Sequence, residues 1–143
     1  MNILKNCLIS EALAPVSASS SIDSNSAILD MAGYEGVIFI VPIEDSVTSG
    51  VATLTIQHNT ANSDSGMAAT DAVATVTCVS SDDINQQLLV AELYKPTKRY
   101  VQGTVTSSAA NIAFGTMIAI RYGPRKGPVT EDATVSDSDL ATG

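Results

Sequence analysis

Hydrophobic and polar residues alternate along much of the chain with the short period that is typical of β-strands. The clearest case is the segment 51–57, VATLTIQ, in which Thr53 and Thr55 alternate with Leu54 and Ile56. Successive side chains of a strand point to opposite faces, so we expect Leu54 and Ile56 to face a core. The pattern therefore predicts a strand with one buried face.

Other segments also have the character of strands. The segment 36–43, GVIFIVPI, is dense in β-branched residues and predicts a buried strand, with Pro42 near its end or at a bulge. Shorter patterns predict further strands at 72–79, 86–94, 99–107 and 112–122.

Turn-forming residues separate these predicted strands. Ser, Asn, Asp, Gly and Pro are concentrated in the stretches 17–26, 58–66, 80–83 and 95–98. Helices over 68–74 and 81–89 are alternatives to part of this assignment, but no helical period continues beyond two turns elsewhere. Short strands at this spacing predict an all-β sandwich or barrel.

The two ends of the chain differ from the part between them. We expect residues 1–14 to form an N-terminal strand or arm that joins the sheet. After Tyr122 a stretch punctuated by Gly and Pro cannot continue a central strand, and the residues beyond it are acidic and low in bulky apolar side chains. The prediction is one β-sandwich domain over 1–122 and an extended acidic arm over 123–143.

The composition suits a single domain with a core of small apolar residues. Of the 143 residues 45% are hydrophobic but only 4% aromatic, with no Trp, so Val, Ile, Leu and Ala must build the core. The start of the chain does not resemble a secretory signal, and we expect Cys7 and Cys78 to be buried free thiols. No apolar run approaches the roughly 20 residues of a membrane helix, so no membrane partner is expected.

Basic residues are concentrated in one window of an acidic chain. Six of the seven bases lie between Lys95 and Lys126, where there is no acid, although the net charge is −8. Such segregation favours contact between the basic window and an acidic surface, on a neighbouring molecule or on the chain's own tail. The overall acidity argues against a nucleic-acid partner, although Tyr and Arg together can stack on single strands.

Tyrosines interleave with these bases, and Tyr and Arg are favoured at the cores of protein interfaces. We therefore predict a protein-interaction site made of Lys95, Lys98, Arg99, Tyr100, Arg121, Tyr122, Arg125, Lys126 and Pro128. The alternative is that these bases only decorate a hairpin turn and the end of the last strand.

The sequence has none of the residue patterns that catalysis or cofactor binding requires. It lacks a G-x-S-x-G elbow, a phosphate-binding loop and a dinucleotide-binding glycine pattern. Its single histidine, His58, is expected to be a solvated side chain, because no cysteine nearby completes a metal site. Adjacent acids such as Glu44 and Asp45 are expected in solvated turns. We predict no catalytic residue, no cofactor and no metal, and therefore no enzyme.

Three segments and the opening MNILK carry a resemblance to a known group. The segments are 30–39, DMAGYEGVIF; 93–101, LYKPTKRYV; and 118–130, IAIRYGPRKGPVT. Together they resemble small structural proteins encoded among the virion genes of tailed bacteriophages, over most of the chain. The resemblance implies a capsid cement (decoration) protein with a jelly-roll-like antiparallel β-sandwich and extended N- and C-terminal arms.

The resemblance also implies partners and a location. Such a protein stabilises the head by bridging subunits of the major capsid protein, and it associates with itself as a homodimer or homotrimer. It lies on the capsid surface of the virion and is assembled in the cytoplasm of the bacterial host. Two alternatives are a head–tail connector or tail structural protein, and a carbohydrate-binding β-sandwich on the virion. The absence of Trp makes a sugar-stacking surface poor.

Overall fold

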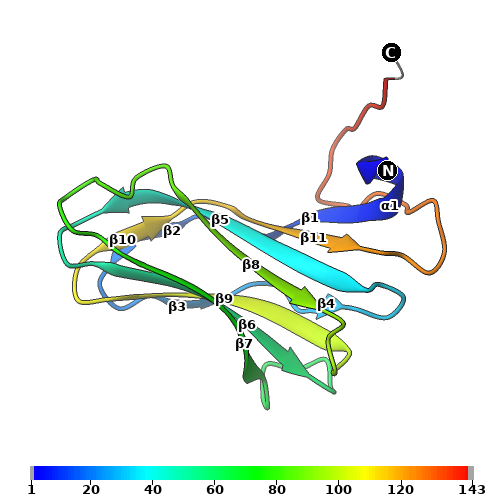
Figure 1. Cartoon of the computed structure of the whole chain (residues 1–143), viewed down its shortest axis with the longest axis horizontal. Coiled ribbons are helices and arrows are strands. Elements are labelled where there is room, and N and C mark those ends of the chain that lie inside the picture. Colours follow the sequence, from blue (N-terminus) through cyan, green and yellow to red (C-terminus); the bar gives the residue numbers. More distant parts are fainter. Residues whose placement is uncertain (1, 142–143) are drawn as a thin grey trace.

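The computed structural model describes residues 2–141, and nearly all of its regular structure is β-strand (Figure 1). In chain order the elements are α1 (Ile3–Asn6), β1 (Cys7–Leu13), β2 (Val16–Ser19), β3 (Asp23–Asn25), β4 (Leu29–Asp30), β5 (Gly36–Ser46), β6 (Val51–Asn59), β7 (Ala68–Thr77), β8 (Leu88–Tyr94), β9 (Tyr100–Ser108), β10 (Ile112–Phe114) and β11 (Met117–Tyr122). The predicted all-β, jelly-roll-like antiparallel sandwich is confirmed.

The first sheet is organised around the long strand β5. On one side β5 pairs with β8; on the other it pairs first with β11 and then with β10. β1 extends this sheet beyond β11, and β2 extends it beyond β10. Every pairing is antiparallel, so residues that lie opposite each other, such as Ile40 and Ile118, point to the same face of the sheet.

The second sheet has the strand order β3-β9-β6-β7, and β4 also pairs with β9. The two sheets form the two layers of the sandwich (Figure 1). Leu54 and Ile56 on β6 are fully buried, as their alternation predicts, and they meet Phe39 and Val41 from β5 in the core between the layers.

The strand prediction is wrong at two places. Residues 17–26 were expected to form a loop but contribute to β2 and β3, whose backbones complete the edges of the two sheets. The segment 112–122 is two strands, because Gly115 interrupts it and donates a backbone hydrogen bond to Pro42. A Cβ on Gly115 would lie 2.6 Å from the ring of Pro42.

The two alternative helices do not form, and the short helix α1 lies where the sequence did not predict one. The alternative helix over 68–74 is wrong, because this segment is part of β7 and buries Ala72 and Ala74 against the core in a strand period. The alternative over 81–89 is also wrong, since turns lead there directly into β8. The N-terminal segment begins with the short helix α1 before it joins the sheet as β1.

Both thiols are free and buried within the described chain, as expected for Cys7 and Cys78. Burial raises the pKa of the thiol in each case.

The last part of the chain, residues 123–141, contains neither helix nor strand. Its first part lies against α1 and β1: Val129 donates a backbone hydrogen bond to the Lys5 carbonyl in α1, and the Thr134 hydroxyl accepts one from the Glu11 amide in β1. The remainder leads away from the sandwich beside α1 (Figure 1).

Candidate interaction surfaces

One end of the sandwich carries a cleft of about 740 Å³, which we call the basic cleft. Three segments that lie far apart in the sequence form it: residues 31–35 between β4 and β5, residues 95–99 between β8 and β9, and residues 123–125 after β11. The cleft therefore depends on the fold and not on any one turn.

Backbone hydrogen bonds hold these three segments together. Lys95 donates to the Glu35 carbonyl at 2.7 Å, and Arg125 donates to the Gly33 carbonyl at 2.8 Å. Gly123 has a φ of +64°, and a Cβ there would lie 2.7 Å from the Cβ of Glu35. Glycine is therefore needed at this turn, both for its left-handed backbone and for the close approach.

The cleft has an excess of positive charge. The bases Lys95, Lys98, Arg99 and Arg125 line it, and the acid Glu35 also does. Arg99 is paired, because its Nε and Nη2 donate to the two carboxylate oxygens of Asp30 at 2.8 and 2.7 Å. No carboxylate of residues 2–141 lies within ion-pair distance of the other three bases.

The pair of Arg99 and Asp30 shifts the titration of both groups. The hydrogen bond from Arg99 lowers the pKa of Asp30 to about 2, and the same bond raises the pKa of Arg99. Arg99 also lies over the ring of Tyr100, with its guanidinium carbon 5.3 Å from the ring centre. These contacts occupy Arg99 within the molecule.

Arg121 has a similar internal role and does not line the cleft. Its side chain is only 12% exposed and forms an ion pair with Asp132 at 3.7 Å. Its Nη1 donates to the Asp30 carbonyl at 3.1 Å, and its guanidinium carbon is 5.4 Å from the centre of the Tyr34 ring. Arg121 therefore connects the C-terminal segment to the sandwich.

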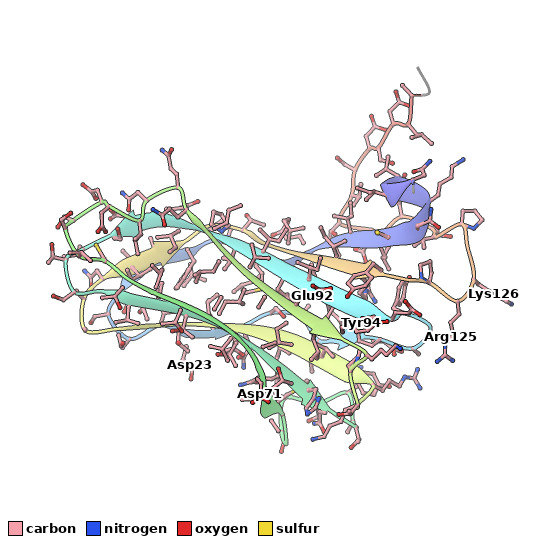
Figure 2. All side chains as sticks on the ribbon, viewed as in Figure 1. Asp23, Asp71, Glu92, Tyr94, Arg125 and Lys126 are labelled. Carbon is pink, nitrogen blue, oxygen red and sulfur yellow. The ribbon has the colours of Figure 1, made fainter. Side chains whose placement is uncertain are left out.

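The remaining residues of the predicted site lie around the cleft. Tyr122 is on the outward side of the first sheet, where its hydroxyl donates to the Glu92 carboxylate. Burial, and next the hydrogen bond to Glu92, raise the pKa of Tyr122. Lys126 and Pro128 are exposed on the loop after β11, and Figure 2 shows Lys126 at the same end of the sandwich as Tyr94. The structure thus gathers Lys95, Lys98, Arg99 and Arg125 but not Arg121.

A second surface, which sequence reasoning missed, is the outward side of the first sheet. We call it the apolar face. Its members come from β5, β8 and β11 and are Ile38, Ile40, Pro42, Leu88, Val90, Tyr94, Ile118 and Ile120. Leu88, Val90 and Tyr94 are 58%, 50% and 56% exposed. The acid Glu92 lies among them.

The signal for the apolar face was present in the sequence. In the run GVIFIVPI the odd-numbered and the even-numbered positions are both apolar, so both faces of the strand carry apolar side chains. One face fills the core, and the other must face away from it. Phe39 and Val41 are fully buried in the core, whereas Ile38 and Ile40 are half-buried on the other side.

The outward side of the second sheet is chemically different. We call it the threonine face, after its members Thr53, Thr55, Val73, Thr75, Thr77 and Thr106 on β6, β7 and β9. Thr53 and Thr75 lie opposite each other and share a hydrogen bond of 3.0 Å between their hydroxyls. Acids flank this face, and Figure 2 shows Asp23 and Asp71 on the second sheet.

His58 is half-buried at the end of β6, so the expectation of a solvated side chain is wrong; burial and then the charge of Lys98 lower its pKa. Within residues 2–141 no cluster of His, Cys, Asp or Glu has a composition able to hold a metal ion. No helix in this part of the chain is long and apolar enough to cross a membrane.

No protein-family model matches the chain, and no curated protein matches it in sequence. Several solved structures align with it, including the following two. PBSX exported protein XepA has 17% sequence identity and a TM-score of 0.48; the alignment covers 99% of this chain and 45% of XepA, so the chain spans less than half of XepA. PirA has 13% identity and a TM-score of 0.35, over 86% of this chain and 96% of PirA. At these values the alignments give no argument about function.

Proposed function

We propose that the protein is a non-enzymatic structural component of a tailed-bacteriophage virion. Within that class we propose a capsid cement protein, which stabilises the head by bridging subunits of the major capsid protein. The observation that carries the proposal is the apolar face, and the sequence resemblance to virion structural proteins supplies the class of partner.

The apolar face is costly for a protein that works alone. Contiguous apolar patches on the surface of monomeric proteins rarely exceed a few hundred Å², and larger ones mark binding sites. Covering such a surface contributes about 25 cal/mol for each Å² of apolar area removed from water. Neighbouring strands already order the side chains of β8, β5 and β11, so little conformational freedom is lost when a partner binds them.

The apolar face suits a protein partner better than a carbohydrate. Its members include one aromatic residue, Tyr94, and the others are mainly Ile, Val and Leu, which offer neither hydrogen bonds to sugar hydroxyls nor an aromatic platform for stacking. A shell of repeated capsid subunits would cover the same face on every bound copy. In this proposal the apolar face lies against the major capsid protein.

Two matched substitutions test the proposal. Val90 on the apolar face and Val73 on the threonine face are 50% and 51% exposed, and both lie on strands. Val90→Asp puts a charge where the partner must bury it, whereas Val73→Asp puts the same charge on the other sheet. Each variant is incubated with capsids that lack the protein, and occupancy is measured after sedimentation of the particles.

We expect Val90→Asp to weaken capsid binding by about a hundredfold or more, because burying an unpaired charge is costly. Val73→Asp should bind as the unaltered protein does. Equal binding of the two variants would exclude the apolar face as the capsid contact. Binding to tail or portal assemblies in place of shells would favour the connector or tail alternative.

A further inference from the structure

We infer that the basic cleft of one copy binds the acidic tail of a second copy. The tail consists of residues 136–141, which follow the anchored segment 123–135. This contact uses neither the apolar face nor a capsid partner, so it stands or fails independently of the proposed cement function. The proposed occupant of the cleft is therefore the tail of a second copy of this same chain.

The anchored segment is fixed to its own sandwich at successive points. Arg125 donates to the Gly33 carbonyl, Val129 to the Lys5 carbonyl, Asp132 pairs with Arg121, and Thr134 accepts from Glu11. Beyond Val135 the hydrogen bonding changes. In residues 136–141 the one side-chain hydrogen bond found is that of Ser138 to Glu131, which also belongs to this C-terminal segment.

The tail carries negative charge that its own molecule leaves unpaired. Asp137 and Asp139 are exposed, and no base of residues 2–141 lies within ion-pair distance of either. In an extended conformation, residues two apart point to the same side, so a tail bound in that conformation would present these two carboxylates as one charged edge. Leu140, which is 42% exposed, would then point to the other side together with Ser138.

The basic cleft has the complementary properties. Lys95, Lys98 and Arg125 line it without an ion-pair partner in the described chain, and Tyr34 and Pro96 supply less polar wall. Unpaired bases on one surface and unpaired acids on an extended segment favour each other, and opposite potentials both speed and orient such an encounter.

The position of the tail favours a second molecule over the same one. Thr134 is held against β1, and from there the tail leads away from the sandwich beside α1 (Figure 1). The cleft is formed by the turns 31–35 and 95–99, which the tail leaves behind. Tail into cleft joins different surfaces of the two copies, so two copies that exchange tails form a twofold dimer, whereas a one-way contact builds a larger ring or an open chain.

A charge-swap experiment tests this contact with full-length protein. The cleft variant carries Lys98→Glu and Arg125→Glu, and the tail variant carries Asp137→Lys and Asp139→Lys. In each variant alone, cleft and tail have the same sign of charge. In an equimolar mixture, the acidic cleft of the cleft variant can bind the basic tail of the tail variant. The unaltered acidic tail of the cleft variant can also bind the unaltered basic cleft of the tail variant. A variant with Lys5→Glu and Lys126→Glu, two exposed bases outside the cleft, controls for net charge.

Association is measured by sedimentation equilibrium at low and high salt, and circular dichroism verifies that each variant is folded. The unaltered chain should self-associate, and salt should weaken the association. Each swap variant should associate at least about a hundredfold more weakly, since like charges in contact repel. The mixture should recover to within about tenfold of the unaltered chain, whereas the control variant should associate normally. A monomeric unaltered chain, swap variants that associate normally, or a mixture without recovery would each overturn the inference.

Discussion

The two outward faces of the sandwich are both built on antiparallel strands but carry very different side chains. The apolar face presents isoleucines such as Ile38, Ile40 and Ile118, whereas the threonine face presents Thr53, Thr55 and Thr75. Both residue types are β-branched and both suit a strand, so strand formation does not explain the difference. What differs is the free energy of leaving each face in water, and this difference supports the proposed partner contact on the first sheet.

The comparison also shows that the core does not require the apolar face. Both sheets fill the core from their inner side, with residues such as Phe39 and Leu54 that are fully buried. The outward isoleucines of β5 are absent from that core. Their role is therefore expected in binding, and replacing them should affect binding more than folding.

The largest expected effect comes from giving the apolar face the chemistry of the threonine face. Ile40→Thr combined with Ile118→Thr alters two residues that lie opposite each other on β5 and β11. Threonine keeps the β-branch, so the strands should persist, but the buried apolar area at the interface falls. We expect capsid binding to weaken by about a hundredfold, measured as occupancy on sedimented particles. Occupancy equal to that of the unaltered protein would contradict the assignment.

The next effect concerns the boundary between the apolar face and the basic cleft. The ring of Tyr122 lies against Gly36, and a Cβ at position 36 would collide with it. Gly36→Ala should therefore destabilise the protein by about 1–3 kcal/mol, the usual cost of overpacking, as measured by urea denaturation. In a Tyr122→Ala background the collision partner is gone, so the additional cost of Gly36→Ala should fall by at least about half. An equal cost in both backgrounds would show that the ring is not the cause.

A smaller effect is expected from acid titration at the cleft. Asp30 has a pKa of about 2 in the folded protein, below the value of about 3.9 for an unperturbed Asp. Its paired carboxylate stabilises the fold fully above about pH 4, and this contribution is lost as the pH falls through about 2. Because Arg99 and Asp30 are 57% and 42% exposed, the contribution is small and salt weakens it. In Asp30→Asn the free energy of unfolding should fall less when the pH is lowered, as measured by denaturation at both pH values. A fall equal to that of the unaltered protein would exclude this pair as a source of the acid sensitivity.

The smallest effect on stability is expected on the threonine face. Thr53→Val with Thr75→Val removes a hydroxyl pair that water can also satisfy, so unfolding should change by less than about 0.5 kcal/mol. The new apolar surface should instead promote self-association, which light scattering detects. A strong loss of stability with no association would mean that the hydroxyl pair stabilises the sheet.

The sequence predicted the strands whose alternation reports burial. In β6, Leu54 and Ile56 face the core as their period requires. The edge strands β2 and β3 escaped prediction, because backbone pairing with β10 and β9 orders them although their residues are mainly small and polar. Sequence patterns report side-chain burial well and backbone pairing poorly.

For the candidate site, the sequence identified the bases but not their arrangement. It grouped Lys95, Lys98 and Arg125 in one predicted interaction site, and the structure places all three around the basic cleft. The sequence could not show that the turn 31–35 lines that cleft, nor that Arg121 forms an ion pair with Asp132. Both facts depend on contacts between residues that are distant in sequence.

The most direct measurement is a cryo-electron microscopy reconstruction of virions that carry the protein, at a resolution that shows side chains. Copies should repeat over the icosahedral shell, with Ile40, Val90 and Ile118 buried against the major capsid protein and the threonine face directed to solvent. Copies confined to the portal vertex or tail, or copies bound through the threonine face, would contradict the account.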